Sequence, residues 1–144
     1  MVDVGAKQES VRLARAQSCI TMSEEAFRLL KEEGHKKGDV LQVARIAGIQ
    51  ATKRTSDLIP LCHPLALTHV SVEFELDDDA CMVRVITSAK LTGRTGVEME
   101  ALTGATVATL TIFDMCKAID PKMQISDTKV LEKVGGKSGH FVCE

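Results

Sequence analysis

Aromatic residues are almost missing from this chain. Its 144 residues include no Trp and no Tyr, and four Phe bring the aromatic content to only 3%. Proteins that bind single-stranded nucleic acids stack bases on aromatic side chains, so this scarcity argues against that class. The formal net charge of -2 also lacks the broad positive field that duplex binding needs. We therefore expect no nucleic-acid partner, and any bound anion must be held by local groups.

Long hydrophobic runs, targeting signals and paired cysteines are also missing. No apolar run approaches the roughly 18 residues needed to span a bilayer, so no membrane contact is expected. The start of the chain, Met1 to Val4, lacks the pattern of a signal peptide. Five cysteines without a C-x-x-C pair are typical of reduced thiols, and we expect a cytoplasmic protein. Four are expected to be small core residues: Cys19, Cys81, Cys116 and Cys143.

The pattern of apolar residues, caps and turns predicts one domain over residues 1–144. Apolar and polar residues alternate over 70–76, which predicts a half-buried strand, and the acidic turn at 77–79 makes it the first arm of a hairpin. The expected elements are strands at 14–22, 70–76, from 81, 123–134 and 140–143, and helices from the Ser23 cap to Gly34, from the Asp39 cap to before Pro60, and over 96–119. This order predicts an α+β, ferredoxin-like sandwich, with an antiparallel sheet and helices packed on one face.

The most unusual segment holds Cys62 and His63 between Pro60 and Pro64. The two prolines forbid ordinary helix or central-strand structure, so the segment is suited to aiming side chains. On the residues alone it could be a metal site, a nucleophile pair or a stiff loop. The histidines and cysteines of the chain have no recognisable zinc spacing, so we expect no metal site.

The long helix at 96–119 carries three features of interest. Asp114 and Lys117 lie three residues apart on one face, where they could be a base and acid pair or a plain surface ion pair. Their apolar neighbours favour burial. Glu98 and Glu100 point about 200° apart, so one could face a pocket and the other a neighbouring subunit, or both could compensate the helix dipole. Small residues, at Gly104, Ala105 and Ala108, permit close approach of another helix or subunit.

Two basic glycine loops are either solvated turns or anion clasps. The first is Gly34 to Gly38, with Lys36 and Lys37. The second, Gly135-Gly136-Lys137-Ser138-Gly139, fails as a P-loop because too little chain follows it for a helix. Backbone N–H groups and a lysine could still bind an anion there.

Several motifs in order closely resemble the molybdenum cofactor biosynthesis protein C family, the cyclic pyranopterin monophosphate synthases. They are Met1 to Val4, Lys37 to Val40, Ala44 to Ala51, Leu61 to Pro64, Gly96 to Thr103, Asp114 to Ala118 and Gly135 to Gly139. The resemblance covers essentially the whole chain. Many members carry a short leader before the position of Met1, so an upstream contact could be missing here.

The resemblance implies an enzyme, a lyase, that rearranges 3′,8-cyclo-7,8-dihydro-GTP to cyclic pyranopterin monophosphate and releases pyrophosphate. It implies no redox cofactor, although Mg²⁺ could arrive with the triphosphate substrate. It also implies a homohexamer, a trimer of dimers, whose subunits share active sites.

Matching the family's motifs makes Asp114 the base and Lys117 the acid, and places His63 with them in one pocket wall. Its substrate-contact segments match Leu61, Cys62, His63, Met99 and Glu100, and Glu98 is expected to contact the substrate from a different wall than Glu100. The triphosphate is expected to meet the basic residues Lys7, Arg12, Lys37, Lys133 and Lys137. Two other classes remain open: a non-catalytic nucleotide- or pterin-binding module, and a structural assembly protein.

Overall fold

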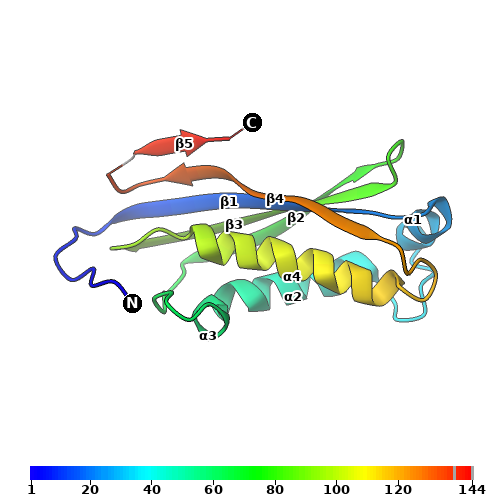
Figure 1. Cartoon of the computed structure of the whole chain (residues 1–144), viewed down its shortest axis with the longest axis horizontal. Coiled ribbons are helices and arrows are strands. Elements are labelled where there is room, and N and C mark those ends of the chain that lie inside the picture. Colours follow the sequence, from blue (N-terminus) through cyan, green and yellow to red (C-terminus); the bar gives the residue numbers. More distant parts are fainter. Residues whose placement is uncertain (138, 144) are drawn as a thin grey trace.

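The computed structural model describes residues 1–137 and 139–143, and its centre is one antiparallel sheet with helices beneath it (Figure 1). The elements, in chain order, are β1 Ser10–Thr21, α1 Glu24–Lys31, α2 Val40–Lys53, α3 Thr55–Leu58, β2 His69–Asp77, β3 Met82–Gly93, α4 Glu98–Cys116, β4 Gln124–Val134 and β5 His140–Val142. The sheet order is β2-β3-β1-β4-β5. Its first four strands have the ferredoxin-like order, and β5 extends β4 as a hairpin. The predicted α+β sandwich is confirmed.

Strand β1 is the centre of the sheet because it pairs with β3 on one side and β4 on the other. Its pairing with β3 runs without interruption from Ser10 with Gly93 to Thr21 with Met82. The pairing with β4 shifts register twice, and Asp127 in the second irregularity has a positive φ of 54°. The amide of Gln17 fits this bulge, since its Nε2 donates to the carbonyl oxygen of Asp127 at 2.8 Å.

Helices α2 and α4 cover one face of the sheet, and they approach each other through glycine. A Cβ added at Gly48 would lie 3.1 Å from the carbonyl oxygen of Gly104 and 3.3 Å from the Cβ of Ala108. A Cβ at Gly104 would collide with the Thr52 hydroxyl. The small residues of α4 therefore serve packing on α2 within the chain, and the alternative of a subunit contact at this stripe is not needed.

Helix α1 begins as expected but ends earlier than the glycine signal indicated. The Ser23 side chain accepts a hydrogen bond from the backbone N–H of Ala26. Glu33 is the residue that takes the left-handed conformation after the helix, with a φ of 57°. Gly34 follows it and donates its N–H to the Leu29 carbonyl at 2.8 Å. A Cβ at position 34 would lie 2.7 Å from a methyl carbon of Leu29, so this side chain would have to rotate away.

The helix predicted from Asp39 to before Pro60 is interrupted. Arg54, with φ -115° and ψ 17°, separates α2 from the single turn of α3. The Thr55 hydroxyl donates to the Ala51 and Thr52 carbonyls, as polar side chains often do where a helix breaks. The break turns the chain toward the N-terminal end of α4 just before the proline-flanked segment.

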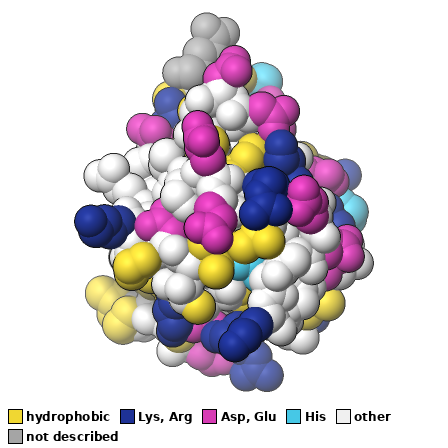
Figure 2. Space-filling model, turned by 90° about the vertical axis from the view of Figure 1, so that its right-hand side faces the viewer, with side chains coloured by type: hydrophobic (Ala, Val, Ile, Leu, Met, Phe, Trp, Pro, Cys, Tyr) yellow, Lys and Arg dark blue, Asp and Glu magenta, His cyan; other side chains and the backbone are white. Residues whose placement is uncertain are grey.

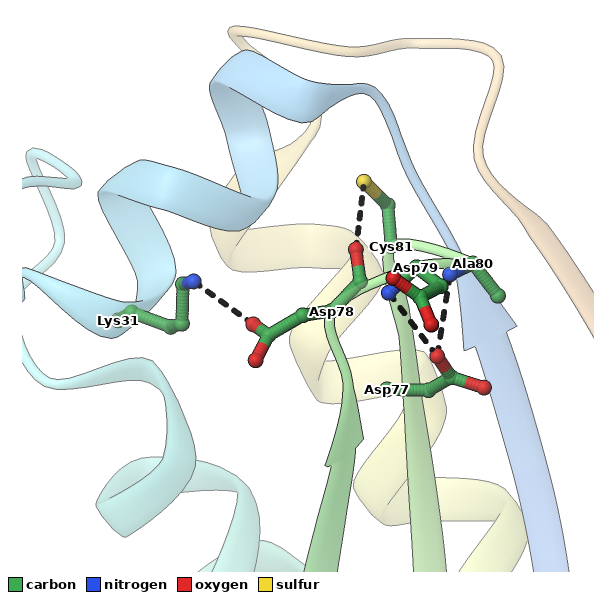
Figure 3. A network of polar contacts seen from close by, with 6 residues as sticks. All are labelled: Lys31, Asp77, Asp78, Asp79, Ala80 and Cys81. Atoms are coloured by element: carbon green, nitrogen blue, oxygen red, sulfur yellow. Dashed lines mark hydrogen bonds and ion pairs between the residues drawn. The ribbon is translucent and has the colours of Figure 1, made fainter.

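The β2–β3 hairpin is tied at its tip to α1 (Figure 3). The Asp77 carboxylate accepts hydrogen bonds from the backbone N–H groups of Asp79 and Ala80, which closes the turn. Lys31 of α1 forms an ion pair with Asp78 at 2.8 Å. The acidic turn expected at 77–79 is therefore a structural anchor for the hairpin.

The core is aliphatic, as the composition requires, with a large cluster under α1, α2 and α4 and a smaller one near the start of α4. Cys19 and Cys116 are buried, but Cys81 and Cys143 are only partly buried, so two of the four expected core cysteines lie at the margin. All five cysteines are free thiols. None of the helices in the described part of the chain is long and apolar enough to cross a membrane.

Replacing Glu33 by glycine should stabilise the fold. A non-glycine residue in the left-handed region costs about 1–2 kcal/mol of stability. Glycine removes this strain, but the greater entropy of its unfolded chain cancels about 0.5–1 kcal/mol of the gain. We expect Glu33→Gly to raise the free energy of unfolding by about 0.5–1 kcal/mol, measured by urea denaturation. The matched control, Glu32→Gly, has an ordinary φ of -91° and should be destabilising. A loss of stability in Glu33→Gly would contradict this reading.

Candidate functional site

A cavity of about 380 Å³ lies at the N-terminal end of α4. It brings together Leu61, Cys62 and His63 from the proline-flanked segment with the first turn of α4. The expected substrate-contact residues that line it are Lys7, Leu61, Cys62, His63, Glu98, Met99 and Glu100. The sequence prediction that these segments meet is therefore matched by the fold.

The proline-flanked segment reaches the cavity because it follows the short helix α3. The chain turns at Ile59, whose carbonyl accepts the N–H of Cys62 at 3.1 Å. The ring of His63 then points to the N-terminal segment, where its Nε2 lies 2.7 Å from the carbonyl oxygen of Val2. Because a carbonyl only accepts, this nitrogen carries the hydrogen. The N-terminal residues Met1 to Val4 also line the cavity. Nothing in the sequence pattern pointed to this contact.

Glu98 and Glu100 line the same cavity, whereas the sequence left open that one of them would face a neighbouring subunit. Residues two positions apart on a helix point about 200° away from each other. The cavity wraps around the end of α4, so both carboxylates reach it. Glu100 is 3% exposed, and burial and the nearby Glu98 raise its pKa. The two carboxylates make this end of α4 a site for N–H donors or cations.

The thiol of Cys62 is not prepared for nucleophilic attack. Burial, together with the charges of Glu100 and Glu98, raises its pKa. The thiolate is the reactive form of cysteine, so a raised pKa lowers its population at neutral pH. The nucleophile alternative for the segment is disfavoured, and Cys62 serves as a wall of the cavity.

A second, basic cavity of about 580 Å³ adjoins the first. Lys7 lines both cavities, and Arg12 and Lys137 line the second. Arg12 is only 3% exposed, and its Nε donates to the Gly93 carbonyl at 3.1 Å. Gly136, with a φ of 76°, lets the loop approach the Arg12 guanidinium, which a Cβ there would hit. A buried guanidinium beside a cavity with two lysines is suited to an anion. Ser138 of this loop lies outside the described residues.

Lys133, an expected triphosphate contact, lines neither of these two cavities, but it forms an ion pair with Glu98, which lines the first. Its Nζ lies 3.5 Å from Oε1 of Glu98, an ion pair without a hydrogen bond. That oxygen is buried and has no hydrogen-bond partner in the part of the chain that the structure describes. A ligand N–H or a shift of Lys133 would satisfy it.

The predicted catalytic pair lies at the opposite end of α4. Asp114 Oδ1 accepts a hydrogen bond from Lys117 at 2.7 Å, and Oδ2 accepts one from Lys37 at 2.8 Å. These two lysines lower the pKa of Asp114 to about 2. The Asp114 side chain is 52% exposed, so the expectation of a buried carboxylate was wrong for the single chain. The helix is buried on its α2 and sheet side, whereas Asp114 faces away.

A carboxyl group with a pKa of about 2 is a weak base at neutral pH, because an effective general base has a pKa near the operating pH. Asp114 as placed here holds two ammonium groups side by side. The lysines, in turn, are available to an anion or as proton donors. Asp114 gains proton affinity only when one lysine is drawn away.

Within one chain the two groups of site residues do not meet. Glu100 and Asp114 are fourteen residues apart on one continuous helix, which separates them by about 21 Å. The expected single wall containing His63, Asp114 and Lys117 is therefore not formed by one chain. Figure 2 shows the end of the molecule that carries α1 and the C-terminus of α4, where acidic and basic side chains are interspersed. The basic pair beside Asp114 is a local feature of this end.

No group of three or more His, Cys, Asp or Glu side chains that could hold a metal ion occurs in residues 1–137 and 139–143. The residues present offer no protein-built metal centre in that part of the chain.

The buried Glu100 should make stability depend on pH. Its raised pKa means that the folded chain binds a proton there more tightly than the unfolded chain, so the free energy of unfolding falls as pH rises above the ordinary Glu value. Glu100→Gln removes this loss, and the variant should gain stability relative to the parent as pH rises from about 4 to 8. Urea denaturation across this range is the measurement, with the exposed Glu73→Gln as control. An identical pH slope in Glu100→Gln and the parent would refute the assignment.

The family of the chain agrees with this arrangement. A family model described as the MoaC family matches residues 1–136 of the 144 residues. The match includes the first cavity, the lining of the second cavity except Lys137, the proline-flanked segment and the Asp114 cluster, and the family acts in molybdenum cofactor biosynthesis. The chain belongs to the MoaC family.

Proposed function

We propose that the protein is a cyclic pyranopterin monophosphate synthase, which converts 3′,8-cyclo-7,8-dihydro-GTP to cyclic pyranopterin monophosphate and pyrophosphate. The observation that carries the proposal is the junction of an acidic cavity and a basic cavity through Lys7. A guanine-derived nucleotide has the same polarity, with N–H donors at the base and negative charge at the phosphates. Membership of the MoaC family supports the pathway.

The acidic cavity suits the base of the nucleotide. The Glu100 and Glu98 carboxyl oxygens would accept hydrogen bonds from the pyrimidine N–H groups. Leu61 and Met99 are 71% and 36% exposed and provide apolar surface for the ring. His63 donates its Nε2 hydrogen to the Val2 carbonyl, so its Nδ1 would orient the substrate by accepting a hydrogen bond from a substrate N–H or O–H group.

The basic cavity suits the triphosphate. Arg12 presents a fixed guanidinium, and Lys7 and Lys137 add mobile charges around it. A Mg²⁺ ion could accompany the triphosphate as part of the substrate. Positive groups here would also stabilise the charge that develops on the leaving pyrophosphate.

The remaining half of the site would come from a second copy of the chain. Exposed and half-buried residues at helical spacing follow one face of α4 between the two half-sites: Met99, Leu102, Thr106, Leu110, Phe113 and Lys117. Leu110 near its middle is 56% exposed. Two such faces packed antiparallel about a two-fold axis would place Asp114 and Lys117 of one chain beside the Glu100 cavity of the other. The family resemblance adds that three such dimers form a hexamer.

In that shared site the proton transfers fall to Asp114 and the lysines. Opening the purine imidazole ring and closing the pterin ring move protons without a redox change. A substrate phosphate that attracts Lys37 would leave Asp114 with one ammonium partner and a higher proton affinity, so that it could act as a base. Lys117 would then return a proton as the acid.

The main alternative is a binding module that holds a nucleotide or pterin without turnover. Such a module would need the basic cavity but not the Asp114 cluster at a distance of about 21 Å along α4.

The direct test is pyrophosphate release from 3′,8-cyclo-7,8-dihydro-GTP with Mg²⁺ present. The parent should release one pyrophosphate per substrate. Asp114→Asn should retain substrate affinity and lose at least about a hundredfold in kcat. Substrate binding by the folded parent without any pyrophosphate release would reject the enzyme in favour of the binding module.

A mixing experiment tests the shared site. His63→Ala and Asp114→Asn damage opposite half-sites, so a refolded equal mixture contains mixed dimers with one intact site. Random pairing predicts recovery of about a quarter of the parent activity, because half the dimers are mixed and each has one intact site of two. The control, a mixture of Lys117→Ala with Asp114→Asn, damages the same half-site and should stay inactive. No recovery in the first mixture would place all residues of a site in one chain.

A further inference from the structure

His35 is a buried titratable side chain that neither the fold nor the proposed reaction has used so far. It is 6% exposed and lies in the loop between α1 and α2, among residues of the loop that are mostly exposed. Its Nε2 lies 2.9 Å from the carbonyl oxygen of Ala26 in α1. A carbonyl oxygen only accepts, so Nε2 carries the hydrogen and donates it.

This hydrogen bond is the side-chain anchor of the loop. The backbone bonds at its ends are the Gly34 N–H to Leu29 and the Gly38 N–H to the His35 carbonyl, at 2.8 Å and 3.0 Å. The second bond closes a turn over His35 to Gly38 but does not attach the turn to the rest of the molecule. The ring of His35 does so, by attaching the turn to Ala26, near the start of α1.

The turn that His35 holds carries Lys37. The Lys37 side chain is 53% exposed, and its ammonium group donates to Asp114 Oδ2 at 2.8 Å across to α4. A lysine side chain has about 2 kcal/mol of rotamer entropy to lose, so a contact from an exposed lysine forms well only when the backbone beneath it is fixed. The backbone of Lys37 is fixed two residues before it by His35 and two residues after it by Asp39, the N-cap of α2.

We propose that His35 is a positioning residue, whose hydrogen bond to the Ala26 carbonyl holds Lys37 against Asp114. Loosening the turn would weaken the ion pair between Lys37 and Asp114, and Lys117 would remain as the main partner of Asp114. Only the expected effect on turnover rests on the proposed function. The effect on Asp114 itself does not.

The test compares His35→Leu, which removes the donor, with His35→Gln, which can place an amide N–H near the position of Nε2. The carboxyl group of Asp114 is titrated by carbon-detected NMR in the full chain. We expect its pKa to rise in His35→Leu, by no more than in Lys37→Met, and to return toward the parent value in His35→Gln. With 3′,8-cyclo-7,8-dihydro-GTP, His35→Leu should lower kcat/KM by about tenfold to a hundredfold.

Two controls separate positioning from a general loss of stability. Phe27→Leu loosens the same helix without removing the hydrogen bond, and it should leave the Asp114 titration as in the parent. In a Lys37→Met background, His35→Leu should cause no further change in that titration. If His35→Leu does not fold, His35→Asn replaces it, because its shorter amide does not reach Ala26.

A parent-like Asp114 titration in the variant without the donor would overturn the proposal. A shift of the Asp114 pKa caused by His35→Leu in the Lys37→Met background would also overturn it. Failure of the proposed reaction would show differently, as an inactive parent protein in which the Asp114 titration still responds to His35.

Discussion

The close packing of α4 against α2 and the sheet is the constraint on which the rest of the structure depends. Gly48 and Gly104 bring the two helix backbones into contact, and the Thr52 hydroxyl, which donates to the Gly48 carbonyl at 2.9 Å, occupies the space that a side chain at position 104 would need. Helix α4 is thereby held as a rigid rod across the sheet face. Both groups of site residues are attached to its ends, so their separation is fixed by the same packing.

The two ends of α4 have opposite chemistry for physical reasons. At the first turn the carboxylates Glu98 and Glu100 lie where the helix dipole favours negative charge, yet burial raises the pKa of Glu100. At the last turn Lys117 lies where a cation is favoured, and with Lys37 it keeps Asp114 ionised. In the proposed reaction the first end would hold the base of the nucleotide, and the last turn of a second chain would supply the groups that transfer protons.

Much of the fold was predictable because its signals are local. The caps at Ser23 and Asp39, the alternation in β2 and the acidic turn each act through neighbours in sequence, and the ferredoxin-like order follows from them. Helix boundaries were less predictable. The helix from the Ser23 cap was expected to end at Gly34, but α1 ends at Lys31, and Glu33 instead of Gly34 takes the left-handed conformation.

The sequence by itself determined which residues are candidates for the chemistry: a histidine and thiol between prolines, paired carboxylates at one helix start, and an aspartate with a lysine three residues on. It also determined the family to which these motifs belong. Only the tertiary structure decided how they are grouped, since Lys7 joins two cavities and Lys37 meets Asp114 through contacts between residues far apart in the chain. It also decided that Glu98 and Glu100 share a cavity, while Asp114 lies about 21 Å from Glu100, because α4 is straight and rises about 1.5 Å per residue.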